Sequence, residues 1–340
     1  MALRKAKIVA TLGPSSNDVK TIEELIKAGL NVARVNMSHG THESHSELIK
    51  NIRQASENVR REVAILIDLQ GPKIRTDKLK EDLVLKDGEE WVIGPTRLKE
   101  EYPEYKDKFI PTIYEALVDD CFDGARILFD DGKLSATATT RDRDVYKIKV
   151  NVGGVLKSNK GINLPDCEVS APAFTDKDRE DLMFALTQNI DYIALSFVRR
   201  RQDIYEVKSL LHNYKVNIPI ISKIEKPQAI DNLDEILEIT DVIMVARGDM
   251  GVEVGNHLVP SIQKDIIKNC EVTIDELAKL KEYASKKNVD FLSTPFEVIS
   301  LRKLISLNLD AIKISSCNLT NYPFLNEAAL SGKPILLSTG

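Results

Sequence analysis

The stretch IPIISKIEKPQAIDNLDEILEITDVIMVA (218–246) decides the fold class of this chain. It contains two short apolar runs, IPIISKI (218–224) and DVIMVA (241–246), and residues 225–240 separate them. Short apolar runs of this kind are typical of strands that are buried on both faces of a sheet. Buried strands that alternate with longer amphipathic stretches indicate a parallel sheet, so this segment predicts two neighbouring parallel strands.

The same alternation extends outward over most of the 340 residues. Amphipathic stretches such as 18–30 and 274–288 lie between the apolar runs, which favours an α/β fold of the (β/α)₈ TIM-barrel type over an open sheet. Nine runs qualify as barrel strands, one more than a closed barrel of this kind needs. Those outside the opening stretch are KIVATL (7–12), NVARVNM (31–37), AILIDL (64–69), YIALSFV (192–198), DFLSTPF (290–296), DAIKISS (310–316) and PILLST (334–339).

Residues 72–168 interrupt this alternation. They are rich in Gly, Asp and Lys and contain short alternating runs such as LSATATT (134–140) and VYKIKVNVGG (145–154). A period of two is typical of antiparallel strands, so we predict an inserted, mostly antiparallel β domain. It follows the third strand, on the side where the loops of a barrel build active sites.

Composition and charge narrow the range of partners. The net charge of −5 provides no basic surface for nucleic acid or an acidic membrane, and no apolar run reaches the ~18 residues of a transmembrane helix. The cysteines Cys121, Cys167, Cys270 and Cys317 form no CxxC pair and indicate a reducing compartment. Because MALRKAKIVATLG (1–13) runs straight into a strand, we expect no signal peptide and a cytoplasmic protein.

Polar and charged side chains lie at the ends of several predicted strands. Residues two apart share a face of a strand, so Arg34, Asn36 and Ser38 point together at the end of the second strand. Lys223 and Glu225 share a face at the end of the fifth strand in the same way. The carboxyl ends of barrel strands converge on one mouth, so we expect these groups to lie around one small space.

Two further charged residues complete this set: Arg75 just past the third strand and Asp249 just past the sixth. The set suits phosphoryl transfer, because two carboxylates can hold Mg²⁺ while arginines and a lysine neutralise the phosphoryl charge. The sequence contains neither a Walker loop (GxxxxGK[ST]) nor GxGxxG, which argues against a P-loop or Rossmann mechanism. Taken singly, each residue also fits a helix cap, an exposed ion pair or a structural partner.

Five motifs then point to one family. KIVATLGPSS (7–16), VARVNMSHG (32–40), ILIDLQGPKIRT (65–76), ISKIEKPQAIDNLDEI (221–236) and VARGDMGVEVG (245–255) occur in order, and through them residues 1–270 resemble pyruvate kinase. The resemblance implies a TIM-barrel part at 1–71 and 169–270 and a lid domain at 72–168. It also implies the glycolytic transfer of a phosphoryl group from phosphoenolpyruvate to ADP, giving pyruvate and ATP, with Mg²⁺ or Mn²⁺ as cofactor.

The resemblance also implies roles for individual residues. Lys223, Arg34 and Arg75 match the catalytic lysine and the phosphate-binding arginines of the family, and Glu225 and Asp249 match its divalent-metal ligands. The implied substrate or nucleotide contacts are Asn36, Ser38, His39, Asp131, Lys160 and Gly248.

Asn36, Ser38 and Asp68 also match the monovalent-cation positions of the family. Lys73 and Leu69 stand where the potassium-dependent members have Glu and Thr. We therefore predict that the Lys73 ammonium replaces K⁺, and that any activity does not require K⁺.

The end of the chain has a different character. STPFE (293–297), KISSCNLTNYP (313–323) and GKPILLSTG (332–340) resemble the sialic acid synthase family, which also uses phosphoenolpyruvate. The resemblance, which begins at about residue 272, implies that Lys313, Ser316, Thr294 and Asn321 lie near its phosphoenolpyruvate region. Asn318 stands where that family has Glu, and the strands with its metal-binding histidines are not found.

A join near Cys270 predicts a hybrid barrel, in which residues 271–340 complete the six kinase-like strands. FLSTPFE (291–297) and AIKISSC (311–317) would be strands seven and eight, with Thr294 near the substrate and the last run surplus. We expect the regulatory C-terminal domain of pyruvate kinases to be absent.

Three functions remain open at this point. The leading hypothesis is a pyruvate-kinase-like phosphotransferase that binds phosphoenolpyruvate and ADP/ATP. The second is a protein that binds phosphoenolpyruvate or Mg²⁺ without turnover, or a purely structural chimeric barrel. Condensation of phosphoenolpyruvate with an acylamino sugar is the least favoured, and the oligomeric state is left open.

Overall fold

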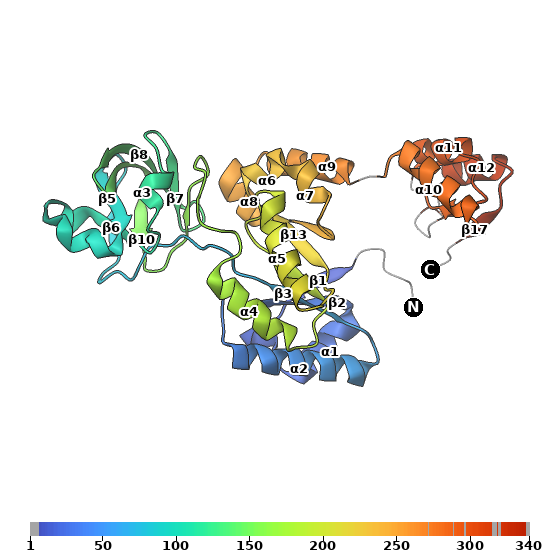
Figure 1. Cartoon of the computed structure of the whole chain (residues 1–340), viewed down its shortest axis with the longest axis horizontal. Helices are drawn as coiled ribbons and strands as arrows, with labels where there is room; N and C mark the ends of the chain where they lie inside the picture. Colours follow the sequence, from blue (N-terminus) through green and yellow to red (C-terminus); the bar gives the residue numbers. More distant parts are fainter. Residues whose placement is uncertain are drawn as a thin grey trace. The chain divides into compact units, whose positions relative to one another are not determined.

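The computed structural model describes residues 7–270, 272–287, 289–295, 297–314, 318 and 321–337. The chain divides into two compact units, Lys7–Ile266 and the residues from Ile267 onward (Figure 1). Within the described residues, no helix is both long enough and apolar enough to cross a membrane.

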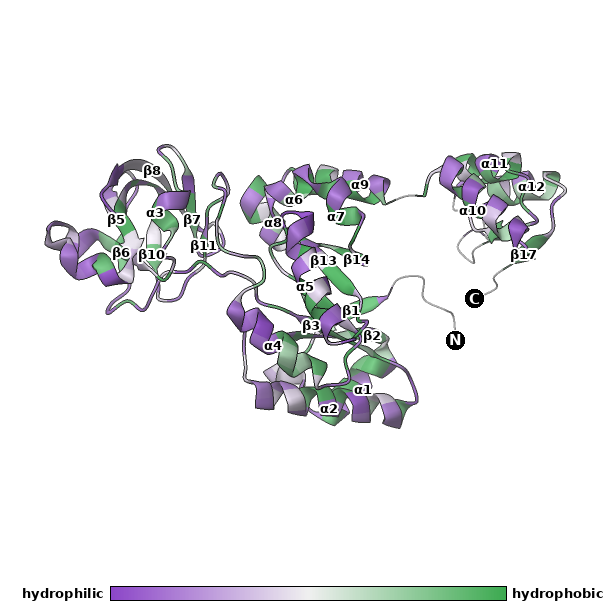
Figure 2. Ribbon diagram, in the orientation of Figure 1, coloured by the Kyte–Doolittle hydropathy of each residue, from purple (hydrophilic) through white to green (hydrophobic). Residues whose placement is uncertain are grey.

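The larger unit is built on a parallel sheet of six strands in the order β1-β2-β3-β12-β13-β14. These strands are the first six apolar runs of the sequence, and they are largely hydrophobic in Figure 2. Ile65, Ile193 and Ile220 are fully buried in the main apolar core, which the strands share with their helices. The strands are β1 (Ile8–Thr11), β2 (Leu30–Asn36), β3 (Ala64–Asp68), β12 (Tyr192–Leu195), β13 (Ile220–Ile224) and β14 (Val242–Val245).

Helices connect these strands, and several of them begin and end at residues with a clear local cause. Asp18 caps α1 by accepting the N–H of Thr21 at 2.9 Å, and Gly29 ends it at φ 115°, which glycine adopts without strain. Thr41 caps α2 through the N–H of Ser44. The elements are η1 (Pro14–Ser16), α1 (Val19–Ala28), α2 (His42–Val59), α4 (Asp176–Leu186), α5 (Arg201–Asn213), α6 (Pro227–Asp231), α7 (Leu233–Leu237), α8 (Arg247–Val254) and α9 (Val259–Asn269).

Residues 72–168 form two sheets of their own, with the orders β11-β7-β8-β9-β5-β6 and β10-β4. Every pair is antiparallel except β5–β6, which agrees with the antiparallel insert predicted from the sequence. A separate core around Trp91, Ile127 and Phe129 stabilises the insert. Its elements are β4 (Leu83–Leu85), β5 (Glu90–Pro95), η2 (Thr96–Glu101), η3 (Pro103–Lys108), β6 (Phe109–Thr112), α3 (Leu117–Asp120), β7 (Arg126–Phe129), β8 (Leu134–Asp142), β9 (Val145–Val152), β10 (Gly154–Leu156) and β11 (Ile162–Asn163).

The smaller unit contains a second parallel sheet, in the order β15-β16-β17. Leu301, Ile312 and Phe324 are buried in its core. Its elements are α10 (Ile274–Lys286), β15 (Leu292–Ser293), α11 (Val298–Ser306), β16 (Ala311–Ile314), α12 (Tyr322–Leu330) and β17 (Ile335–Leu337).

The strand pairing supports an α/β fold but does not confirm the predicted closed hybrid barrel. We expected two C-terminal strands to close the sheet, but β15, β16 and β17 pair with one another, and β1 and β14 remain edge strands of the larger sheet. The nine apolar runs therefore divide into an open sheet of six and a sheet of three. The parallel pairs β15–β16 and β16–β17 hold these strands together, and Ile312 and Ile314 of β16 are buried in the core of the smaller unit.

Candidate active site

Asp68 lies at the centre of the charged groups at the carboxyl end of the six-stranded sheet. Its carboxylate is buried, and Arg34 Nε of β2 donates to its Oδ2 at 2.6 Å. Arg34 also donates through Nη1 to the hydroxyl of Thr11 at 2.7 Å. Asn36 of β2 is paired in register with Asp68 of β3. Arg34 lies two residues before Asn36 and therefore points from the same face of β2, from which its side chain reaches the Asp68 carboxylate.

Lys223 of β13 lies beside this ion pair. Its Nζ donates to Ser196 Oγ at 2.8 Å and lies 3.5 Å from Asp68 Oδ1 and 3.5 Å from Glu225 Oε1. The side chain is 9% exposed, so a buried ammonium lies between two carboxylates. The fold thus brings together four residues that the sequence singled out, Arg34, Asp68, Lys223 and Glu225.

Glu225 follows β13 and is only 1% exposed. Its Oε1 accepts the N–H of Phe197 at 2.8 Å, whereas its buried Oε2 has no hydrogen-bond partner among the described residues. Burial raises the pKa of Glu225 to about 7; Lys223 opposes this rise, and the nearby Asp249 carboxylate adds to it. Glu225 and Asp249 are therefore close neighbours, as a shared cation would require.

A pocket of about 570 Å³ contains further predicted residues in its walls. Lys73 and Arg75 line it, and their side chains have no hydrogen bond or ion pair within the described part of the chain. Burial lowers the pKa of Lys73, and the neighbouring Arg75 lowers it further. Two neighbouring, half-buried cations that have no partner among the described residues fit an anionic ligand such as a phosphate. The predicted residues in the walls are His39, Lys73, Arg75, Asp131, Lys160 and Asp249.

Lys160 reaches the pocket from the insert. Its Nζ pairs with Asp130 Oδ1 at 2.7 Å, and this contact raises the pKa of Lys160. Asp131, the residue predicted from the sequence, lines the pocket beside Asp130 and has a left-handed φ of 57°. The insert therefore supplies both charge signs to the pocket.

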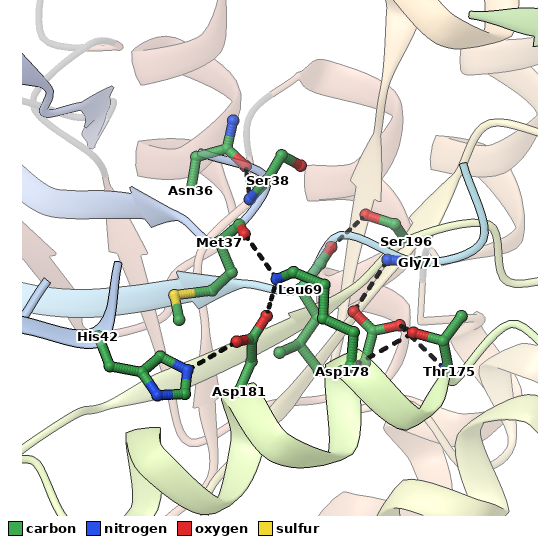
Figure 3. Close-up of polar contacts among 11 residues, drawn as sticks. Asn36, Met37, Ser38, His42, Leu69, Gly71, Thr175, Asp178, Asp181 and Ser196 are labelled. Atoms are coloured by element: carbon green, nitrogen blue, oxygen red, sulfur yellow. Dashed lines mark hydrogen bonds and ion pairs between the residues drawn. The ribbon is translucent and has the colours of Figure 1, made fainter. Parts of the chain in front are cut away.

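The segment after β2 is held by α4. Asn36 Oδ1 accepts the N–H of Ser38 at 3.0 Å (Figure 3). Lys177 Nζ donates to the carbonyl of Met37 at 3.0 Å and pairs with Asp181. Asn36 and Ser38 are not among the residues that line the pocket. Asn36 ends β2, and Ser38 lies on the short turn that follows, which Lys177 of α4 contacts at the carbonyl of Met37.

Other predicted residues lie elsewhere. Gly248 is in the first turn of α8 with open space around it, and it does not line the pocket. Thr294 belongs to the smaller unit, as do Lys313 in β16 and Asn321, whose side chain caps α12. Ser316 lies outside the described residues. The predicted place of Thr294 in the kinase-like site is thus untested.

Three residues at the site were missed from the sequence. Ser196 is hydrogen-bonded to Lys223, and Arg199 and Lys226 line the pocket. Ser196 follows β12 in ALSFV, so the rule that strand ends carry the site residues already pointed to it. Lys226 follows Glu225 directly and comes just past the end of β13, so its place after a strand end is a signal that could have found it.

The residues present fit a Mg²⁺ ion, judged by their unsatisfied atoms. The buried Oε2 of Glu225 needs a partner, and the Asp249 carboxylate is its neighbour. Among the described residues, no group of three or more His, Cys, Asp or Glu side chains forms a complete metal cage. Mg²⁺ suits such a partial site, because it is usually bound by one or two carboxylates and keeps several waters.

Comparison with known families agrees with this geometry. Residues 3–277 match the model "Pyruvate kinase, barrel domain". The chain belongs to the pyruvate kinase family. Pyruvate kinases of Staphylococcus aureus strains MRSA252 and USA300 are each 45% identical to it over 271 residues, which is 79% of this chain and 46% of theirs. The chain thus spans about half the length of these curated relatives.

A second match covers the end of the chain, where residues 255–340 fit the NeuB family model. Both parts of the predicted resemblance are therefore confirmed: pyruvate kinase first, then a sialic-acid-synthase-like segment. The two matches overlap over residues 255–277, and the join predicted near Cys270 falls within that overlap.

Proposed function

We propose that this chain is a pyruvate-kinase-type phosphotransferase, which moves the phosphoryl group of phosphoenolpyruvate to ADP. The observation that carries the proposal is a pocket lined by two cations, Lys73 and Arg75, and by Asp249, a neighbour of Glu225. Within the described residues, neither cation has a partner and Glu225 Oε2 has no hydrogen bond. In this reaction the P–O bond to the enolate oxygen breaks and a P–O bond to the ADP β-phosphate forms. The enolate then takes up a proton and becomes pyruvate.

In this proposal the acidic residues would bind the metal ion and the basic residues would stabilise the phosphoryl charge. Glu225 and Asp249 would hold Mg²⁺ or Mn²⁺, which supplies positive charge to the transferring phosphoryl group when bound. Lys223, Arg34 and Arg75 would stabilise the same charge with fixed ammonium and guanidinium groups. Asp131 and Lys160 would act from the insert, which would exclude water as a lid. A glycolytic role and a cytoplasmic location rest on family membership.

Lys223 provides the test of this proposal. Lys223→Ala should lower pyruvate release from phosphoenolpyruvate, ADP and Mg²⁺ by about 10²–10³-fold or more, because a fixed charge next to the reacting group is lost. Pyruvate is followed with a coupled dehydrogenase, and folding is checked by circular dichroism. Lys208→Ala on α5 is the matched control. The Lys208 ammonium lies 3.1 Å from Asp241 Oδ1, and Lys208 does not line the pocket. Full activity in Lys223→Ala would dismiss the assignment.

Lys73 leads to a second prediction, that turnover does not need K⁺. Its ammonium lies near Arg75, Asp249 and Lys223 and already places one positive charge in the site. We expect equal turnover in potassium and choline buffers, and we expect Lys73→Glu to make turnover depend on K⁺. A strong K⁺ requirement in the unmodified chain would contradict this prediction.

A second candidate function is binding of phosphoenolpyruvate and Mg²⁺ without turnover. The open sheet favours it, because β1 and β14 are edge strands and Thr294 belongs to the other unit. Calorimetry that shows binding while no pyruvate forms would select this alternative. Sialic-acid-synthase-type condensation has less support, since only residues 255–340 match that family.

A further inference from the structure

Three side chains connect the insert with the six-stranded part of the larger unit. Asn163 of β11 donates through Nδ2 to Glu253 Oε1 of α8 at 2.7 Å. Lys226, which follows β13, donates through Nζ to the same Oε1 at 2.6 Å. One carboxylate oxygen therefore receives one donor from the insert and one from the sheet.

Glu253 is almost fully buried, at 2% exposure. Its second oxygen, Oε2, has no hydrogen-bond partner among the described residues. A buried carboxylate depends on its donors, because an unpaired buried charge is strongly destabilising. Asn163 and Lys226 are the side-chain donors that Glu253 has in the described part of the chain, so the loss of either leaves the buried carboxylate with one.

Lys226 extends this connection into the site. It lines the pocket, and its Nζ lies 5.7 Å from the centre of the Phe197 ring, within the range of a cation–π contact. The N–H of Phe197 in turn donates to Glu225 Oε1 at 2.8 Å. Phe197 has a left-handed φ of 56°, which is unusual for an aromatic residue and indicates that its surroundings hold it there.

We propose that Glu253 is a positioning residue that couples docking of the insert to binding of the phosphate-bearing ligand. Through Asn163 it holds β11 against α8, and through Lys226 it holds a cation on the pocket wall and supports Phe197 beside Glu225. The ligand part of this inference rests on the proposed function, whereas the docking part does not.

The first test measures docking in the full chain without ligand. Asn163→Ala removes the donor of the insert, and Asn163→Asp places a like charge against Glu253. Hydrogen–deuterium exchange of residues 158–174 should rise about tenfold or more in Asn163→Ala and further in Asn163→Asp, since a hydrogen bond to a buried charge is lost. Asn151→Ala is the control, because it loses a 2.8 Å bond to Thr137 within the insert. Equal exchange in the Asn163 and Asn151 variants would overturn the docking role.

The second test measures coupling with phosphoenolpyruvate and Mg²⁺. Asn163→Ala and Lys226→Met should each weaken phosphoenolpyruvate binding by about tenfold in calorimetry, and the double variant should lose less than the product of the two effects. In turnover assays KM should rise while kcat changes much less, because Lys223 and Glu225 are untouched. Strict additivity, or a fall in kcat alone, would overturn the coupling. No binding by the unmodified chain would refute the proposed function, and the exchange test would still decide docking.

Discussion

At the scale of single residues, burial and chemistry conflict at Glu225. The Glu225 carboxylate is almost fully buried. Its Oε1 accepts the N–H of Phe197, and its Oε2 has no hydrogen bond within the described residues. Burial raises its pKa from 4.5 to about 7, against the attraction of Lys223. A residue in this state is costly for folding and suited to hold a cation, which is a common compromise at functional sites.

This conflict leads to a prediction for the metal-free protein. Between pH 4.5 and about 7 the folded state keeps a proton on Glu225 that the unfolded state has released. The free energy of unfolding should therefore contain a component that falls as pH rises through this window. Glu225→Gln should lack that component and be more stable than the unmodified chain above pH 7.

Urea denaturation at a series of pH values measures this difference. Glu24→Gln on the exposed surface of α1 serves as the control, because it removes a carboxylate without removing a buried one. Parallel stability curves for the Glu225→Gln variant and the unmodified chain would contradict the prediction.

At the scale of secondary-structure elements, α4 holds the ends of β2 and β3. Asp178 Oδ1 accepts the N–H of Gly71 at 3.0 Å, and Asp181 pairs with His42 at 2.8 Å (Figure 3). Asp181 also pairs with Lys177. Thr175 caps the helix and fixes its first turn, where Lys177 and Asp178 lie. One helix thus positions both the turn that follows Asn36 and the chain that leads to Arg75.

Asp181→Ala should destabilise the chain by ~2–3 kcal/mol, because it removes a buried carboxylate that contacts both His42 and Lys177. Without Asp181, Lys177 is also no longer held in place to donate to the carbonyl of Met37. Glu180→Gln, at the neighbouring exposed position of α4, should change stability by less than about 0.5 kcal/mol. Chemical denaturation of both variants measures the difference. Equal midpoints would show that α4 does not depend on this contact.

At the scale of the whole molecule, the parallel strands of the described residues form two sheets, and the closed barrel expected from the sequence is not confirmed. Ile8, Val9 and Val242 on the edge strands are 40%, 49% and 39% exposed, as unpaired edges would be. Exposed apolar edge strands are uncommon in stable proteins, because they invite pairing with further strands.

The edges lead to a prediction for amide exchange in the full chain. Amides of β1 and β14 should exchange faster than those of the central strands β3 and β12, because only the latter have a strand on both sides. Hydrogen–deuterium exchange resolves these segments. Equally slow exchange in all four strands would show that further strands cover the edges, which would restore the closed barrel predicted from the sequence.

The strands, the insert and the charged residues at the strand ends could all be predicted from the order of the amino acids. Strands that are buried on both faces consist of apolar runs, which the sequence shows directly. Side-chain alternation predicted that Lys223 and Glu225 share a face, and in the structure their charged groups lie 3.5 Å apart. Only the folded structure shows which strands the C-terminal runs pair with, because DAIKISS (310–316) has the same apolar pattern whether it closes one barrel or joins a second sheet. It also decided that Glu253 receives Asn163 and Lys226, because contacts between residues about 90 and 27 positions apart leave no periodic trace in the sequence.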